Sequence, residues 1–211
     1  MLKNLFSSEP KRVEPADAEK REEPTPSLAL KEFIARLEEF PKPHVLDLGW
    51  ACGTNIDFFG HRGCKIFIED LYNTLVPLLP QPEAAETFDY AALFREVLPH
   101  PLDSMDGVLT WDLFNYLPVE VLQPLNQRLF ELCKSGGVLF SLLSSSKEVP
   151  AAPTLYRVAD EHHLLYEKQS EMQQNIRPLS NNDMMRAVAP FSVLNSYFLR
   201  NGVREVLFIR R

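Results

Sequence analysis

Hydrophobic side chains alternate along the chain between helical spacing and short continuous runs. Apolar residues three and four positions apart predict helices, and this spacing occurs in the segments 28–40, 54–59, 71–79, 92–98, 118–137 and 181–191. Apolar runs of strand length predict buried strands at 44–49, 64–70, 106–112 and 137–143, with a weaker candidate at 86–91. This alternation predicts an α/β fold in which helices cover both faces of a mostly parallel sheet.

The last part of the chain has a different pattern. Two strand-like runs, 191–200 and 203–211, are separated by the dipeptide Asn201-Gly202. Asn-Gly favours a tight turn of the primed type, so the two runs are expected to form an antiparallel hairpin. The expected architecture is therefore a doubly wound, mostly parallel sheet of seven strands with a C-terminal antiparallel hairpin.

Composition divides the 211 residues into two zones. Residues 1–27 are rich in proline and in charges of both signs and have almost no apolar periodicity, so we expect a flexible tail ahead of one domain, 28–211. The net charge of −7 gives no reason to expect binding to nucleic acid. No apolar run is long enough to span a bilayer, and residues 1–20 lack a signal-peptide core, so we expect a cytoplasmic protein that does not insert into membranes.

Cysteine and histidine spacing does not suggest a metal centre. The three cysteines lack the spacing of metal ligands. His162 and His163 are adjacent, and adjacent residues on a strand point to opposite faces, so these two side chains are not expected to bind one ion together.

The stretch HVLDLGWACGTN, residues 44–55, carries the main functional signal. The strand ends at Asp47 and Gly49, and a glycine there permits a sharp turn away from the sheet. Ala51 and Gly53 keep the turn thin, so that a ligand can approach the backbone closely. The helix that follows directs its N–H groups to the carboxyl end of the strand, where open α/β sheets bind ligands.

The next strand ends in the residues IED, 68–70. An acid at this place can accept hydrogen bonds from both ribose hydroxyls of a nucleoside. Glu69 is the better candidate, because Asp70 is expected to begin the next helix. A glycine turn with a downstream acid also occurs in NAD-binding folds, so these two motifs alone leave open either nucleotide cofactor or a purely structural turn.

Taken together with the other segments, the chain resembles the class I S-adenosylmethionine-dependent methyltransferases. VLDLGWACGTN resembles their first motif, FIED lies where their ribose-binding acid falls, and ETFDY lies where their third strand brings residues to the adenine. MDGVLTWDLFNYLP is similar to their fourth strand and following loop, LFELCKSGGVLFSLL to their fifth strand with its preceding helix, and the terminal hairpin to their last two strands. The resemblance covers about residues 28–211. One difference is that the family's middle glycine is Ala51 here, beside the bulky Trp50.

The resemblance implies S-adenosylmethionine as cofactor and methyl transfer to a small-molecule or protein acceptor. It implies a set of cofactor contacts: Asp47, Gly49, Trp50, Ala51, Gly53, Asn55, Glu69, Asp70, Asp89, Trp111 and Asp112. Because the sulfonium methyl group is already electrophilic, such an enzyme mainly aligns the nucleophile and excludes water. The catalytic candidates follow the fourth strand: Asp112, Asn115 and Tyr116. Helix capping or packing is the alternative role for each of them.

Residues 144–180 form a connection that is longer than most. The runs 154–160 and 163–169 are expected to pair as an added hairpin at the carboxyl edge of the sheet, as a lid or substrate wall. Tyr156, Arg157 and His162 are the substrate-side candidates on this segment.

Two other functions stay open. Ala51, Trp50 and the absence of a recognisable catalytic loop also suit a methyltransferase-like binding or scaffold protein without activity. An NAD-dependent oxidoreductase is less favoured, because of the terminal hairpin. The sequence identifies neither the methyl acceptor nor the oligomeric state.

Overall fold

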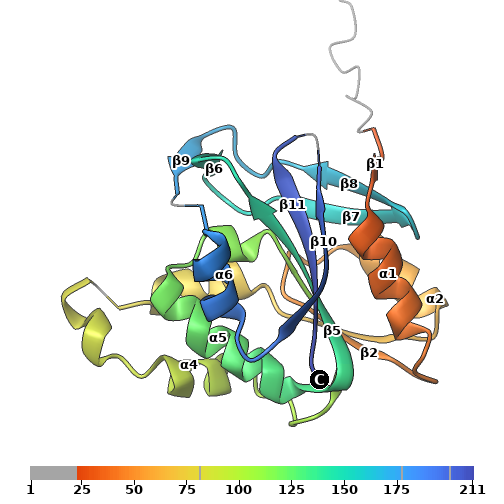
Figure 1. Cartoon of the computed structure of the whole chain (residues 1–211), viewed down its shortest axis with the longest axis horizontal. Helices are drawn as coiled ribbons and strands as arrows, with labels where there is room; N and C mark the ends of the chain where they lie inside the picture. Colours follow the sequence, from red (N-terminus) through yellow and green to blue (C-terminus); the bar gives the residue numbers. More distant parts are fainter. Residues whose placement is uncertain (1–22, 81, 177, 200) are drawn as a thin grey trace, which may run out of the picture.

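A computed structural model describes residues 23–80, 82–176, 178–199 and 201–211. Its main sheet has six strands in the order β10-β11-β5-β4-β2-β3 (Figure 1). The strands are β2 (His44–Asp47), β3 (Lys65–Ile68), β4 (Met105–Trp111), β5 (Cys133–Ser144), β10 (Ser192–Phe198) and β11 (Val203–Ile209). β3, β2, β4 and β5 run parallel, whereas β11 is antiparallel to both of its neighbours. This is the mixed α/β sheet with an antiparallel end that the sequence predicts.

Helices cover both faces of this sheet. Figure 1 shows α1 (Leu28–Leu37) and α2 (Gly53–His61) on one side, and α4 (Tyr90–Val97), α5 (Val119–Leu132) and α6 (Asn181–Val188) on the other. The short helix α3 (Leu71–Leu75) packs on the same side as α4 and α5. Each face buries its own apolar cluster, which is why every residue of the central strand β4 is buried.

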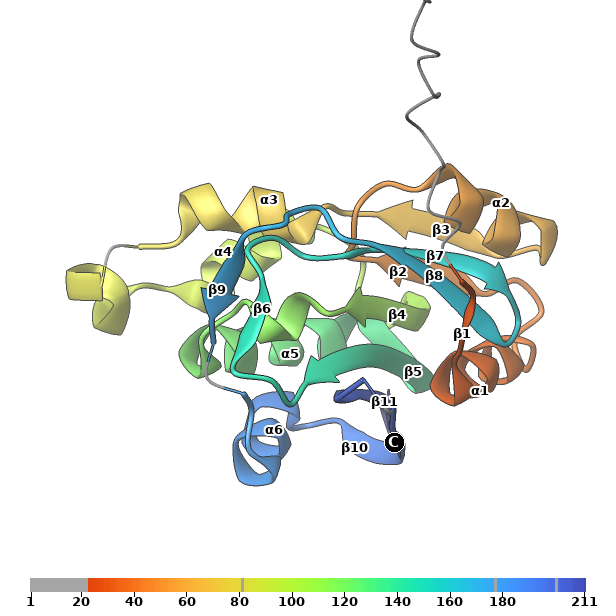
Figure 2. The same cartoon turned by 90° about the horizontal axis from the view of Figure 1, so that it is seen from above.

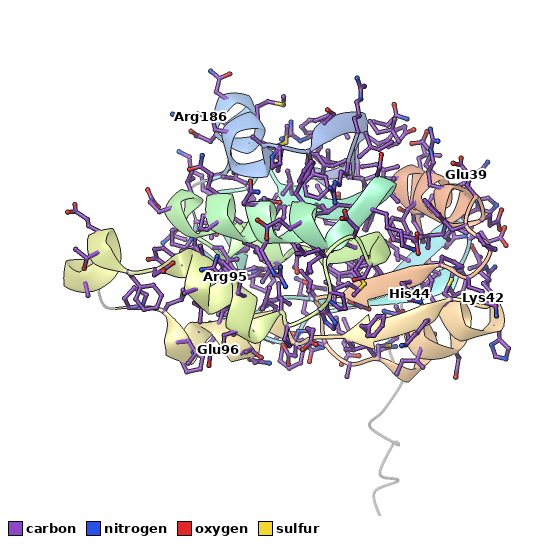
Figure 3. All side chains as sticks on the ribbon, turned by 90° about the horizontal axis from the view of Figure 1, so that it is seen from below. Glu39, Lys42, His44, Arg95, Glu96 and Arg186 are labelled. Atoms are coloured by element: carbon purple, nitrogen blue, oxygen red, sulfur yellow. The ribbon has the colours of Figure 1, made fainter. Side chains whose placement is uncertain are left out.

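The exposed surface of the molecule carries charges of both signs. Glu39, Lys42, Arg95, Glu96 and Arg186 are exposed and are labelled around the molecule in Figure 3. None of the helices in the described part of the chain combines the length and the apolar character that a membrane crossing requires.

The long connection after β5 adds four strands: β6 (Glu148–Pro150), β7 (Leu155–Asp160), β8 (His163–Glu167) and β9 (Gln173–Asn175). β7 and β8 form the predicted antiparallel hairpin, and β6 pairs with β9. Figure 2 shows these strands lying across the end of the main sheet at which β5 finishes. The connection therefore covers the carboxyl edge of the sheet, where the functional residues were predicted.

The start of the domain lies earlier than predicted. The expected tail, 1–27, falls largely on residues 1–22, which lie outside the described residues. β1 (Thr25–Pro26), however, pairs with β8 and completes a three-stranded sheet. Ser27 is buried and its hydroxyl accepts a hydrogen bond from the Leu30 N–H group, so it caps α1.

The strand predicted at 86–91 is wrong. Residues 82–87 form the 3-10 helix η2 (Pro82–Thr87), and α4 begins at Tyr90. The carboxylate of Asp89 accepts a hydrogen bond from the Ala92 N–H group at 2.8 Å, and this cap commits the segment to the start of a helix. The main sheet of the described residues accordingly has six strands, not seven.

The turn between β10 and β11 also differs from the prediction. The Leu199 carbonyl accepts from the Gly202 N–H group, and the Leu199 N–H group donates to the Val203 carbonyl. These bonds close the hairpin between Leu199 and Val203, not around Asn201-Gly202 alone. Gly202 takes the left-handed position of this loop, with φ of 81°.

Candidate functional site

The predicted ligand turn joins β2 to α2 at the carboxyl edge of the sheet. Asp47 ends β2, and its Oδ1 atom accepts hydrogen bonds from the Gly49 N–H group at 3.0 Å and from the Trp111 indole at 2.6 Å. Burial raises the pKa of the Asp47 carboxyl from 3.8 to about 6, although these hydrogen bonds lower it. The buried carboxylate of Asp47 therefore stabilises the turn through its hydrogen bonds to Gly49 and Trp111.

The concave side of the turn is filled by Trp111. A Cβ atom placed on Gly49 would lie 2.5 Å from Cδ1 of this indole, so the ring rests directly on the glycine. Trp111 has a φ of 48°, in the left-handed region that large residues rarely adopt. The cavity that remains beside Gly49, Trp50 and Trp111 has a volume of about 10 Å³, the space of about one water molecule.

Residues 151–154 pack over the turn between β2 and α2. The Trp50 indole donates to the Pro153 carbonyl at 3.1 Å, and the Tyr116 hydroxyl donates to the Ala152 carbonyl at 3.0 Å. The Thr154 N–H group donates to Oδ2 of Asp112 at 3.1 Å. The connection after β5 is therefore attached to three of the predicted site residues by hydrogen bonds.

Asn55 attaches β7 to the start of α2. Its side-chain amide donates to the Tyr156 carbonyl at 2.9 Å and accepts from the Val158 N–H group at 2.8 Å. The Tyr156 ring stacks on Trp111, with centroids 5.5 Å apart and planes at 8°. In this conformation protein side chains fill the space beside the turn.

The acids predicted near the ribose and the adenine have different partners. The Glu69 carboxylate pairs with Nε2 of His100 at 3.2 Å. Asp70 caps α3, as the sequence predicts, and also borders the small cavity beside Gly49. Asp89 is exposed and caps α4, so the structure does not bring it to the turn.

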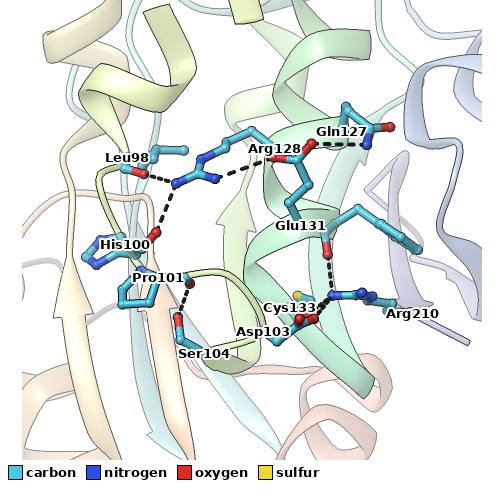
Figure 4. A network of polar contacts seen from close by, with 11 residues as sticks. Leu98, His100, Pro101, Asp103, Ser104, Gln127, Arg128, Glu131, Cys133 and Arg210 are labelled. Atoms are coloured by element: carbon cyan, nitrogen blue, oxygen red, sulfur yellow. Dashed lines mark hydrogen bonds and ion pairs between the residues drawn. The ribbon is translucent and has the colours of Figure 1, made fainter. Parts of the chain in front are cut away.

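A buried arginine holds the loop that carries the partner of Glu69. Figure 4 shows Arg128 of α5 donating to the carbonyls of Leu98 and His100, at 2.8 and 2.9 Å. The rim of the site near Glu69 therefore rests on α5.

The three catalytic candidates have different surroundings. The side chain of Asn115 donates to the Leu142 carbonyl and accepts from the Ser144 N–H group, so it ties the loop after β4 to the end of β5. Burial raises the pKa of the Tyr116 hydroxyl well above its ordinary value of 10, and the nearby Asp112 carboxylate raises it further.

Asp112 is 6% exposed, and burial raises the pKa of its carboxyl from 3.8 to about 7. Among the described residues its Oδ1 atom has no hydrogen-bond partner. Asp112 is therefore the catalytic candidate that retains an unpaired hydrogen-bond acceptor.

The substrate-side candidates lie on the added hairpin. Tyr156 lines a cavity of about 380 Å³ between the hairpin and the main sheet, together with Asp112 and Asn115. Arg157 forms an ion pair with Glu167 across the hairpin. His162 is exposed at the hairpin turn and does not line this cavity.

The same cavity includes a residue that the sequence analysis missed. Glu205 lies on β11 and is 1% exposed. A signal was present in the run VREVLFI: Glu205 is directly followed by four apolar residues, and an acid on a strand of this kind is buried if the strand packs on both faces. Burial raises the pKa of the Glu205 carboxyl, although hydrogen bonds from the start of α1 lower it.

Comparison with protein-family models found no match, and comparison with curated proteins found none either. Among solved structures, the chain is similar to the PH0226 protein from Pyrococcus horikoshii, with a TM-score of 0.51 and 12% identity over 87% of this chain and 88% of that one. The chain shares the α/β fold of that protein.

Two methyltransferase complexes are also similar in fold. The glycopeptide N-methyltransferase MtfA with S-adenosyl-L-methionine matches with a TM-score of 0.46 and 14% identity, over 86% of this chain and 92% of that one. The 1,6-didemethyltoxoflavin-N1-methyltransferase from Burkholderia thailandensis, with its acceptor and S-adenosylhomocysteine bound, matches with a TM-score of 0.45 and 15% identity, over 87% and 78%. At these identities and TM-scores, neither likeness indicates what this chain binds or does.

Proposed function

We propose that this chain is an S-adenosylmethionine-dependent methyltransferase whose cofactor site is closed by its own residues 151–156. The observation that carries the proposal is the turn from Asp47 to Gly53, which sits at the carboxyl edge of a methyltransferase-type sheet. α2 starts at Gly53, and within the described residues its N-cap, Cys52, makes no side-chain cap hydrogen bond. A helix start of this kind suits the carboxylate of an amino-acid ligand.

The closed state is held by contacts that can break without unfolding the domain. Five hydrogen bonds of 3.1 Å or shorter attach residues 152–158 to Trp50, Asn55, Asp112 and Tyr116, and a typical bond of this kind contributes about 0.5–1.5 kcal/mol net. Opening would then cost about 2.5–7.5 kcal/mol, and the affinity for the cofactor would be weaker by roughly 70-fold to 3 × 10⁵-fold than in an open state.

Calorimetric titration with S-adenosylhomocysteine tests this proposal. Trp50→Phe and Tyr116→Phe each remove one donor to residues 152–153 and keep the aromatic ring. Each variant is expected to bind the ligand about 2- to 12-fold more tightly than the unmodified protein, because the opening cost falls. Tyr90→Phe on α4 is the matched control, with unchanged affinity.

Two other outcomes are informative. Tight binding to the unmodified protein, with weaker binding to both variants, would contradict the closed state and retain the methyltransferase. No binding to any of the proteins at millimolar ligand would contradict the methyltransferase proposal.

One observation favours a second candidate, a binding protein that uses no cofactor. The left-handed backbone of Trp111 costs of order 1–3 kcal/mol and persists only where the surroundings enforce it. Its indole donates a hydrogen bond to the buried carboxylate of Asp47 and stacks on the ring of Tyr156. These contacts are typical of a protein core that does not open to admit a ligand. Absence of ligand binding in the titrations above would support this candidate.

A further inference from the structure

The cavity of about 380 Å³ lies between two sheets, next to the filled turn, and Asp112 and Thr154 border both the cavity and the small space beside the turn. Its walls include Leu142 of β5 and Val203 of β11 from the main sheet, and Tyr156 and Tyr166 from the hairpin β7–β8. Small-molecule sites have volumes of about 300–1,000 Å³ and are mostly apolar with a few polar groups. The cavity meets both criteria.

Two buried carboxylates line this cavity, and each has one oxygen without a partner among the described residues. These atoms are Oδ1 of Asp112 and Oε1 of Glu205, from side chains that are 6% and 1% exposed. The other oxygens are engaged: Oδ2 of Asp112 accepts from Thr154, and Oε2 of Glu205 accepts from the Ala29 N–H group at 3.1 Å. A buried acceptor without a donor costs free energy, which a ligand with N–H groups would recover.

The charge of the lining favours a positive ligand. Among the described residues of its lining, three are acids, Asp112, Glu148 and Glu205, and one is a base, the exposed Lys168. A metal ion is not supported, because no group of three or more His, Cys, Asp or Glu side chains in the described ranges could hold one. The rings of Tyr156 and Tyr166 instead suit an organic cation, which gains from contact with aromatic faces.

We propose that this cavity binds a small organic amine in its protonated form, with N–H donors directed at Asp112 and Glu205 and its apolar part against Tyr156 and Leu142. The site does not depend on the proposed methyltransferase activity, because its lining is complete while the turn at Gly49 is filled.

The test compares three ligands of nearly equal shape on the full chain without cofactor: benzylamine, benzyl alcohol and benzoate. Ligand-observed saturation-transfer NMR and calorimetry are expected to show binding of benzylamine at millimolar concentration, at least about tenfold tighter than binding of the other two. Because the measurement contains no S-adenosylmethionine or analogue, its result is independent of the cofactor titrations.

Asp112→Asn and Glu205→Gln then locate the site. Each keeps an acceptor for its backbone donor and removes the negative charge, and each is expected to weaken benzylamine binding about tenfold or more. Asp89→Asn, which changes an exposed acid on α4, is the matched control and should bind normally. Thermal unfolding identifies any variant that fails to fold, and the comparison of ligands on the unmodified protein still decides the charge preference.

The proposal is overturned by any of three results: no benzylamine binding, equal binding of benzyl alcohol, or unchanged affinity in both folded carboxylate variants.

Discussion

The indole nitrogen of Trp111, at the end of β4, donates a hydrogen bond to Oδ1 of Asp47, at the end of β2, over 2.6 Å. This bond joins two neighbouring strands at the edge where the ligand turn begins, and Asp47 is 1% exposed. Trp111→Phe removes the donor and keeps an aromatic ring. We expect it to lower the free energy of unfolding by about 1–3 kcal/mol, because a buried acceptor loses a partner.

Urea unfolding followed by circular dichroism measures this loss. Trp50→Phe is the matched control, since the half-buried Trp50 indole donates to an uncharged acceptor, the backbone carbonyl of Pro153, and its loss should be smaller. Equal losses in the free energy of unfolding would show that the hydrogen bond to Asp47 stabilises the fold no more than the hydrogen bond to Pro153.

Stability should fall as the pH rises through the titration of Asp112. Burial raises the pKa of this carboxyl in the folded state to about 7, whereas its ordinary value is 3.8. Between these values the folded state holds a proton that the unfolded state has lost. The contribution is therefore fully present below about pH 4 and is lost as the pH rises through about 7, with a total of about 2–4 kcal/mol.

The measurement is urea unfolding at several pH values for the unmodified protein and for Asp112→Asn, which cannot titrate at this position. The stability of the unmodified protein relative to the variant should decrease from acidic to neutral pH. Asp89→Asn, at an exposed acid, should give a nearly flat difference. A difference that stays flat or rises with pH for Asp112→Asn would contradict the expected shift.

Lys134 compensates a carboxylate that has no access to solvent. Its Nζ atom lies 2.7 and 2.8 Å from the two oxygens of Asp106, whose side chain is 0% exposed, and the His44 N–H group donates to the same carboxylate at 2.8 Å. Lys134→Met keeps most of the apolar stem and leaves the charge on Asp106 unbalanced. We expect a loss of about 2–4 kcal/mol in the free energy of unfolding.

Lys31→Met is the control for this substitution, because Lys31 is exposed on α1, and a change there should stay within about 0.5 kcal/mol. The measurement is again urea unfolding. Similar small losses for both lysine variants would mean that the ammonium group of Lys134 is not required to stabilise the buried carboxylate of Asp106.

Two truncations separate the contribution of β1 from that of the residues before it. Deletion of 1–22 should leave thermal unfolding unchanged, because the composition of that segment predicts little burial. Deletion of 1–26 also removes Thr25 and Pro26, which pair with Leu164 and His163 on β8. This deletion should cost a further 1–2 kcal/mol, approximately, because the edge of β8 loses its cover. Identical unfolding of the two truncated proteins would assign β1 no energetic role.

Local sequence patterns predicted most of the strands of the sheet. They failed where a hydrogen bond from one side chain determined the backbone conformation. The apolar runs at 44–49 and 106–112 became β2 and β4, because a strand buried on both faces needs no other signal. The run at 86–91 has similar apolar content, yet Asp89 caps a helix there. From the sequence alone, an acid that caps a helix cannot be distinguished from an acid within a strand unless the start of the helix is known.

The turn at Gly49 was predictable because its chemistry lies within a few neighbouring residues. Its closure was not, because it depends on Trp111 meeting Tyr156 from a connection whose path over the sheet the sequence does not specify. Glu205 was missed for a related reason: its burial depends on the start of α1 packing beside β11. Contacts between segments far apart in the chain decided both features.

The position of β11 sets the order in which the sheet can be completed during synthesis. Among the described strands, β10 pairs with β11 alone, and β11 is also the antiparallel partner of β5. Since β10 precedes β11 in the chain, a nascent chain that has reached residue 198 carries two strand edges with no partner for either. Both edges close at once when Val203–Ile209 becomes free to pair. A ribosome that stalls between these two strands would leave an exposed apolar edge on β5, the kind of surface that recruits chaperones or other chains.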